Sequence, residues 1–530
     1  MRITPFILAC STLLAGPTSA DELITKDGRQ FTITKARKLE DGRFELSFKH
    51  GQILCDPRFV ESVEIEGNMA DYVPKDDRER ENLEKGYVRH KGKWMSKNSY
   101  ETLLEKEAEA TRERLAELEL HSAFRNGYEL ETRHFTFKSN ASPELLEYYA
   151  ELLGAYYKLM DNRVGIKPTP TLKRTKMHVN IYKSREDWNE HTSVGPGVVG
   201  FFSPSDQTLN FFHMAEDPGV SNWVSLHECT HLLTYLIQPT FQPRIWVNEG
   251  VADFFGSATI QTDKKGKLEI IPGKLQVERV LTVKNAIAAG KNLSLEGLFA
   301  VERDEFHSFE YSHAWSFVYF LNNTDKYAKH FKKFFKDFYT LSKKVDFEWN
   351  GPFRVVSAEE TRRLLLDTLR VKDPEALETE WLTYIRDLEI DAPVALFKRG
   401  LATVMRGESK AYEEATLDLT TALEQGVEDP RLFWALGKIK AASLLKFEEG
   451  LELLEKAVEL DPFNARFRAS VGSVHMGMAY GSPKDSAEFQ AAALESFGLA
   501  SELSPGDDYY EGLLENARQQ FKSLNEKRAK

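Results

Sequence analysis

The sequence predicts a multidomain α+β protein with a small β unit, a central α+β domain and an all-α repeat domain. Near the start of the chain, glycine-containing turn signals separate short alternating runs. In the middle, an apolar helical run carries H-E-x-x-H among mixed strand-like and helical segments. Towards the end, glycines and prolines recur at near-constant spacing. At 530 residues, 42% of them hydrophobic, the chain is long enough for about three or four domains.

Residues 1–20 are predicted to be a signal peptide. Arg2 supplies the positive charge, an apolar run follows, and Thr18-Ser19-Ala20 resembles a cleavage site. The run is too short to span a bilayer, and no later stretch is apolar enough to do so. We therefore expect an exported protein, periplasmic or extracellular, with no integral membrane segment after cleavage. Cys10 faintly resembles a lipidation site, and this alternative stays open.

Two accessory segments are predicted before the central domain. In residues 21–66, turn signals such as Asp41-Gly42 and His50-Gly51 separate about four or five strands, which favours an SH3-like β unit. Its role as a plain accessory fold or as a partner-binding module stays open. Residues 67–125 are heavily charged and are predicted to be a helical connector.

The chemistry centres on the sequence SLHECTH at residues 225–231, inside an apolar helical run. Residues four apart share one face of a helix, so His227 and His231 can point at one metal ion. Glu228 lies beside them, as in zinc hydrolases. Cys229 projects to the opposite, apolar stripe and is predicted to lie in the core rather than to bind metal.

A second helical run, WVNEGVADFF at residues 246–255, follows after a short loop. Glu249 is the natural third ligand. Asp253, one turn further on, could accept the far N–H of a ligating histidine. Tyr311 could donate to an oxyanion. His313 beside it is either an assisting group or an ordinary packing residue.

These segments resemble the gluzincin metallopeptidases, which bind zinc through H-E-x-x-H and a glutamate of N-E-G-x-A-[DE]. The resemblance covers residues 126–394 and implies a thermolysin-like α+β domain. It assigns Zn²⁺ to His227, His231 and Glu249 and the general base to Glu228. Exported bacterial proteins with a gluzincin-like domain and tetratricopeptide repeats are a closer match. The segment that grips a free amino terminus in the aminopeptidase branch is absent, so endo- or exopeptidase action stays open.

A hairpin is predicted from Val198–Phe202 and Thr208–Phe212. In gluzincin-like sites, an edge strand pairs with extended substrate, and this hairpin is the candidate for that edge. An ordinary sheet hairpin is an equal alternative.

Residues 395–530 resemble degenerate tetratricopeptide repeats. Gly400, Gly437 and Gly472 recur at a near-constant period, and prolines close each helix pair. Stacked pairs leave a concave face that could bind a protein partner, although a purely structural cap is a fair alternative.

The charge of the chain bears on nucleic-acid binding, and the positions of its cysteines bear on disulfide formation. The net charge of −12 argues against nucleic-acid binding. The basic stretch Lys326–Lys344 carries phenylalanines three and four apart, which indicates an amphipathic helix instead. Cys55 and Cys229 fall in different predicted domains, so no structural disulfide is expected.

The sequence therefore predicts an exported zinc metallopeptidase that acts on peptide or protein substrates. The main alternative is a non-catalytic scaffold that binds partners through its helical repeats. Retention of Glu228 beside the full ligand set favours the enzyme. Zinc-dependent hydrolysis of a non-peptide amide stays open.

Overall fold

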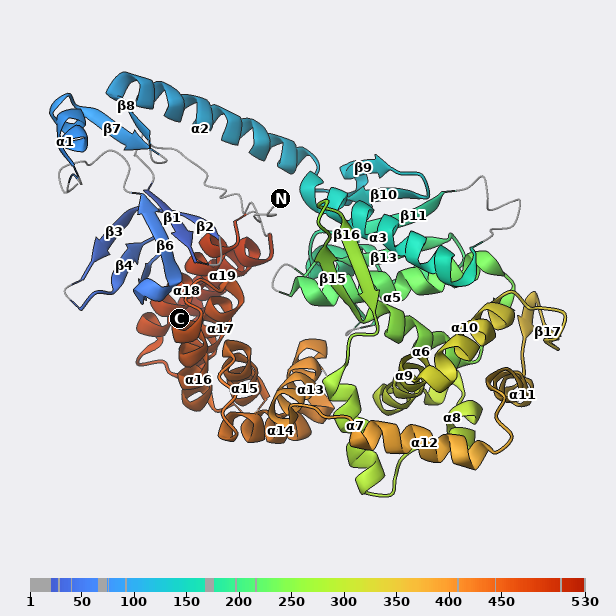
Figure 1. Ribbon diagram of the computed structural model, residues 1–530. Coiled ribbons are helices and arrows are strands. Elements are labelled where there is room, and N and C mark those ends of the chain that lie inside the picture. Colours follow the sequence, from blue (N-terminus) through green and yellow to red (C-terminus); the bar gives the residue numbers. More distant parts are fainter. Residues whose placement is uncertain are drawn as a thin grey trace. The chain divides into compact units, whose positions relative to one another are not determined.

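The computed structural model describes residues 21–528, except residues 27–28, 40, 65–73, 75, 91–92, 167–175, 196–197, 215–216, 408, 444 and 506–507. The predicted signal peptide, including Cys10, lies outside the described residues. The described chain is mixed α+β, as predicted, with small sheets near its N-terminal end and helices towards its C-terminal end (Figure 1). None of the helices in these ranges is both long and apolar enough to span a membrane.

The chain divides into two compact units, residues 1–119 with 427–530 and residues 120–426. The first unit contains two antiparallel sheets, ordered β2-β1-β6 and β3-β4-β5, and the hairpin β7–β8. Gly42 adopts a positive φ of 90° in the tight turn between β3 and β4. The strands are β1 (Asp21–Thr25), β2 (Gln30–Ile33), β3 (Lys35–Lys38), β4 (Phe44–Ser47), β5 (Gln52–Cys55), β6 (Val60–Glu64), β7 (Tyr87–His90) and β8 (Lys93–Ser96).

The N-terminal strands and the C-terminal helices of this unit share one hydrophobic core. Leu23, Phe31 and Ile53 are buried together with Phe463 and Phe497. Neither the small sheets nor the last helices could bury these side chains alone, so each completes the core of the other. The helices are α1 (Asp77–Glu84), α2 (Lys97–Leu120), α15 (Pro430–Ser443), α16 (Phe447–Leu460), α17 (Ala465–Gly481), α18 (Ser486–Leu503) and α19 (Asp508–Arg528).

The second unit is built on a five-stranded sheet, ordered β12-β13-β11-β10-β9. The three inner strands are parallel, and an antiparallel strand lies at each edge. Successive residues of β13 point to opposite faces, so Phe211 and Phe212 enter two different cores. The predicted hairpin is confirmed and places β12 at a sheet edge. The strands are β9 (Tyr128–Glu131), β10 (Phe135–Ser139), β11 (Met177–Tyr182), β12 (Gly200–Ser203) and β13 (Thr208–Phe212).

Helices α3 and α5 pack against this sheet and against each other, and α6 packs between α5 and α9. Several helices begin at a recognisable cap, such as Ser142 before Pro143 in α3. The helices are α3 (Pro143–Val164), α4 (Arg185–His191), α5 (Pro218–Ile237), α6 (Ile245–Gly256), α7 (Val277–Ala288), α8 (Leu295–Ala300), α9 (Ser308–Asn323), α10 (Asp325–Tyr339), α11 (Ala358–Leu369), α12 (Pro374–Asp387), α13 (Ala392–Arg406) and α14 (Tyr412–Glu424).

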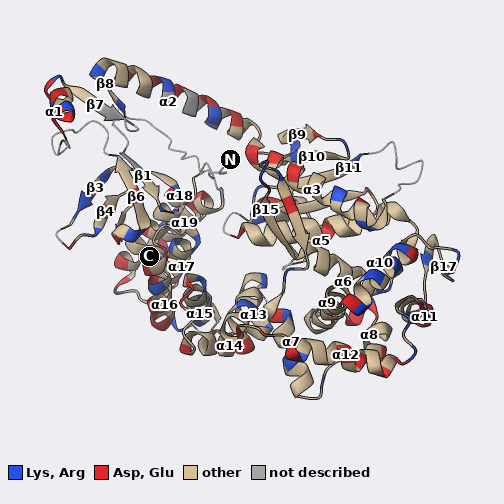
Figure 2. Cartoon of the chain, in the orientation of Figure 1, with Lys and Arg blue, Asp and Glu red and all other residues tan. Residues whose placement is uncertain are grey.

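Helix α10 is amphipathic, as its phenylalanine spacing predicts. Phe331, Phe334 and Phe338 are buried in the core of the unit. Lysines occupy its exposed face, and acidic and basic residues are interspersed over the rest of the unit (Figure 2). The basic stretch thus follows from a solvated helix face above an aromatic core.

Two small sheets complete the second unit. One is the hairpin β15 (Ala258–Thr262) and β16 (Leu268–Pro272), whose turn contains Gly266 at a positive φ of 79°. A three-stranded sheet ordered β14-β18-β17 was not predicted. Its strands β14 (Phe241–Gln242), β17 (Glu348–Asn350) and β18 (Phe353–Val355) are very short, and β14 lies more than a hundred residues from its partner. Such a pairing leaves no periodic signal in the sequence.

Candidate metal centre

Helix α5 presents both predicted histidines on one face. Pro218 is the first residue of the helix, which ends at Ile237, two residues before Pro239. His227 is buried and His231 is partly exposed. The opposite stripe is fully buried in the core, including Leu226, Cys229 and Leu232. The apolar stripe therefore fixes the rotation of the helix and with it the direction of the two imidazoles.

Helix α6 brings Glu249 to the same place because glycines allow close helix contacts. A Cβ atom at Gly250 would lie 2.9 Å from the carbonyl oxygen of Ala314 in α9. A Cβ atom at Gly256 would lie 3.1 Å from the backbone nitrogen of His227. Larger side chains at these positions would push α6 away from both neighbours.

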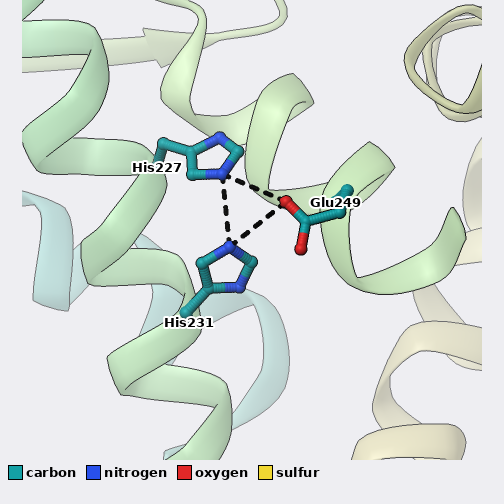
Figure 3. A group of neighbouring side chains, drawn as sticks. All are labelled: His227, His231 and Glu249. Carbon is teal, nitrogen blue, oxygen red and sulfur yellow. Dashed lines mark hydrogen bonds and ion pairs between the residues drawn. The ribbon is translucent and has the colours of Figure 1, made fainter. Parts of the chain in front are cut away.

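The three donor atoms form a small triangle (Figure 3). Nε2 of His227 lies 3.2 Å from Nε2 of His231 and 3.3 Å from Oε2 of Glu249. The third edge, from His231 Nε2 to Glu249 Oε2, is 3.5 Å. In a tetrahedral zinc site with bonds of about 2.0–2.1 Å, ligand atoms lie about 3.3–3.4 Å apart. The triangle therefore fits one ion of this kind, and the buried group could bind a metal.

A chain of polar contacts behind the site fixes His227. Its Nδ1 atom lies 3.1 Å from Oδ1 of Asp253, which is fully buried. Arg279 of α7 lies 2.7 Å from the other oxygen of Asp253 and donates through Nε to Gln276 at 2.8 Å. The Asp253 contact keeps the proton on Nδ1 and leaves the Nε2 lone pair for a metal. Sequence reasoning missed Arg279, because nothing in its own helix marks it.

The electrostatic environment favours a cation. Burial by itself would lower the pKa of His227, but Asp253 and Glu249 hold that pKa well above its ordinary value. Burial likewise would raise the pKa of Glu249, but the two histidines hold it well below its usual range. Glu249 is therefore ionised, and its negative charge lies where a metal ion would be held.

Glu228 lies in the cavity beside the triangle and is partly exposed. Its Oε2 atom accepts a hydrogen bond from the backbone N–H of Phe202 at 3.1 Å. Burial raises the pKa of this carboxyl group. A carboxylate with a raised pKa, facing the space in front of a metal site, has the properties of a general base.

Tyr311 of α9 also reaches the triangle. Its hydroxyl group donates to Oε2 of Glu249 at 3.1 Å. Burial and the nearby carboxylates raise the pKa of Tyr311 far above neutral pH, so the phenol keeps its proton. His313 is fully buried, accepts from the backbone N–H of Leu293 and contacts the carbonyl of Phe309. It is a packing residue of α9.

A cavity of about 810 Å³ opens in front of the triangle and is lined by five of the six predicted site residues. Asp253 lies behind His227 and does not line it. Aromatic side chains form much of the remaining wall. The lining includes Phe201, Phe202, Tyr235, Phe241, Tyr339 and Phe353.

Cys229 provides a check on the orientation of α5. Its side chain is fully buried among apolar residues, and burial raises the pKa of the thiol. Cys229→Ala is expected to lower the free energy of unfolding by about 1 kcal/mol, the effect of removing a small buried group. Denaturant unfolding measures this free energy, and elemental analysis measures the metal content, which is expected to stay unchanged. Loss of metal by a folded Cys229→Ala protein would contradict the assigned helix face.

Fold and site define a mixed α+β protein with a buried histidine–histidine–glutamate group that could bind a metal ion. Residues 224–348, which include His227, His231, Glu249 and Tyr311, match a family described only as a protein of unknown function, DUF1570. No curated protein matches the chain.

Proposed function

We propose that the protein is an exported zinc-dependent metallopeptidase of gluzincin type. The observation that carries this proposal is the triangle of His227, His231 and Glu249 with the Glu228 carboxylate beside it. Ligands alone would also suit a structural metal site, which is closed by a fourth protein ligand. Here the three ligands border a cavity large enough for a segment of peptide, as a catalytic site requires.

The roles of the residues follow from their positions. His227, His231 and Glu249 would hold Zn²⁺, which when bound supplies a Lewis acid that polarises the scissile carbonyl and acidifies water. Glu228 takes a proton from the water that attacks the carbonyl carbon and returns it to the leaving amine. Tyr311 keeps its proton and can turn its hydroxyl from Glu249 to the developing oxyanion.

The free edge of β12 is an argument that the substrate is a peptide. The backbone N–H of Phe202 points at Glu228 rather than at β13, so this edge of the sheet faces the cavity. An extended peptide could add to the edge through main-chain hydrogen bonds and place its carbonyl near the metal. Recognition of this kind selects unfolded or extended chain segments rather than folded domains.

A non-catalytic scaffold is the second candidate, supported by the paired helices of the C-terminal region. Helices α15 and α16 pack as one pair, and α17 and α18 as another, which resembles tetratricopeptide repeats. In the first unit, however, the chain's own N-terminal strands already cover part of α17–α19. The surface left for a partner is smaller than in an open repeat array.

Metal content tests the proposal. Purified protein is expected to contain about one Zn²⁺ per chain, because three protein ligands and water complete one tetrahedral site. Elemental analysis after growth with ample zinc, iron and manganese measures both identity and amount. Protein that is folded but holds no zinc would overturn the assignment, and another metal bound at one equivalent would correct its identity.

A further inference from the structure

The hairpin β17–β18 carries exposed aromatic side chains on two different faces. In an antiparallel pair, residues directly opposite each other share a face. Trp349 pairs with Arg354 and therefore lies on one face, whereas Asn350 pairs with Phe353 on the other. Phe353 and Val355, two residues apart, both line the cavity, and neither Trp349 nor Arg354 does. The pleat thus directs Phe353 into the cavity that also contains the metal ligands.

Phe353 is held at a fixed place. Strand β18 pairs with β14, and the backbone N–H of Arg354 donates to the carbonyl of Thr240 at 2.6 Å. On β14, Phe241 stacks edge-on against Phe338 of the core, with 5.0 Å between ring centroids. Val356, directly after β18, is fully buried. A ring on an anchored strand loses little conformational entropy on binding.

The two faces differ in what covers their aromatic rings. On the outer face, the Arg354 guanidinium lies 5.1 Å from the ring centroids of both Phe347 and Trp349. Across the described residues, no ring or cation stacks on Phe353, which is 37% exposed. Exposed apolar surface inside a cavity is the usual sign of a ligand contact.

Two arginines, Arg244 and Arg303, line the cavity, and the first is already bound within the protein. The lining guanidinium of Arg244 is 12% exposed and bound to Glu302 at 2.9 Å. It also donates to the backbone carbonyls of Ala300 and Val301. Its hydrogen-bonding capacity is therefore largely used within the protein, and the apolar wall remains the main recognition element near β18.

We propose that Phe353 and Val355 form a subsite for a large apolar side chain of an extended peptide substrate, with aromatic residues preferred. The subsite rests on the proposed peptidase function, because it shares one cavity with the metal ligands and Glu228. A peptide paired with the edge of β12 would offer alternate side chains to the cavity walls, and one of them would contact Phe353.

Equilibrium binding tests the subsite separately from catalysis. Fluorescently labelled extended peptides, with phenylalanine or serine at one position at a time, are titrated against the zinc-loaded Glu228→Gln protein. We expect phenylalanine at one position to bind about tenfold more tightly than serine, the size of one aromatic contact removed from water. Adding Phe353→Ala should abolish this preference, whereas Phe353→Leu, which keeps a large apolar side chain, should retain most of it.

Trp349→Ala is the matched control, since Trp349 is more exposed, at 60%, and lies on the other face of the same hairpin. It should keep the preference. A preference that survives Phe353→Ala, or that is lost equally in Trp349→Ala, would overturn the subsite. The subsite would also be overturned if light scattering showed that Phe353→Ala alters self-association of the protein while the peptide preference stays the same. If the preference depends on Phe353 but wild-type protein cuts no peptide, the peptidase proposal fails and the subsite stands. Cleavage with an unchanged preference in Phe353→Ala would refute the subsite alone.

Discussion

Replacement of Glu228 with glutamine is expected to abolish peptide hydrolysis while fold and zinc content stay unchanged. Glutamine has the same shape, and its oxygen can still accept the hydrogen bond from Phe202 that Glu228 accepts at 3.1 Å. An amide cannot take a proton from water at neutral pH, so the chemical step loses its base. The assay is cleavage of a denatured protein by wild type and variant at matched zinc occupancy.

Two further variants make this result specific. Tyr311→Phe should slow turnover by about 10²–10³, the usual cost of removing one oxyanion donor, and keep zinc. Tyr235→Phe is its control, because Tyr235 lines the same cavity without contacting the triangle. If wild type and Glu228→Gln cleave equally, the activity belongs to a contaminant and the enzyme proposal fails. The scaffold alternative predicts no turnover in any of these proteins.

Loss of metal is the expected result of Glu249→Ala. The variant removes one of three ligand atoms and the negative charge that lies 3.3 and 3.5 Å from the histidine nitrogens. Two imidazole ligands alone do not complete a tetrahedral zinc site. After dialysis, the variant should therefore hold far less zinc than wild type, and its hydrolysis should fall in proportion.

Asp418→Ala is the control for Glu249→Ala, because it also removes a buried carboxylate but not a proposed metal ligand. Asp418 is buried in the same unit and forms an ion pair with Arg399 at 2.6 Å, and neither residue lines the cavity. Its removal should destabilise the fold, because it leaves the partly buried Arg399 with only the longer ion pair to Glu414, at 3.7 Å, but it should leave zinc content unchanged. Equal zinc in Glu249→Ala and wild type would show that the metal binds elsewhere.

The residues of the candidate metal centre could be predicted because helix geometry makes their directions calculable. His227 and His231 share a face by their spacing of four, and the apolar stripe with Cys229 fixes which face is buried. Arg279 and Phe353 escaped prediction for a physical reason. Arg279 belongs to another helix and contacts Asp253, and Phe353 lies on β18, which pairs with the distant strand β14. The local sequence around each of them is ordinary.

The fold shows the same division between local and distant information. Turn residues and alternation located most N-terminal strands, and glycine spacing located the helix pairs of the C-terminal region. The shared core of these two regions was not predicted. Arg29 donates to the carbonyl of Phe463 across 434 residues of sequence, and the carboxylate of Glu502 accepts the backbone N–H groups of Lys49 and His50. Such contacts depend on tertiary packing alone.

A peptide-library digest of the mature protein, with and without a chelator, tests the central claim most directly. We expect cleavage of extended peptides by the untreated protein, loss of cleavage after the chelator removes the metal, and recovery when Zn²⁺ is restored. Mass spectrometry of the products would place the cut sites, and terminal or internal cuts would identify exo- or endopeptidase action. Cleavage that is indifferent to the chelator, or absence of cleavage by protein with a full complement of zinc, would contradict the account.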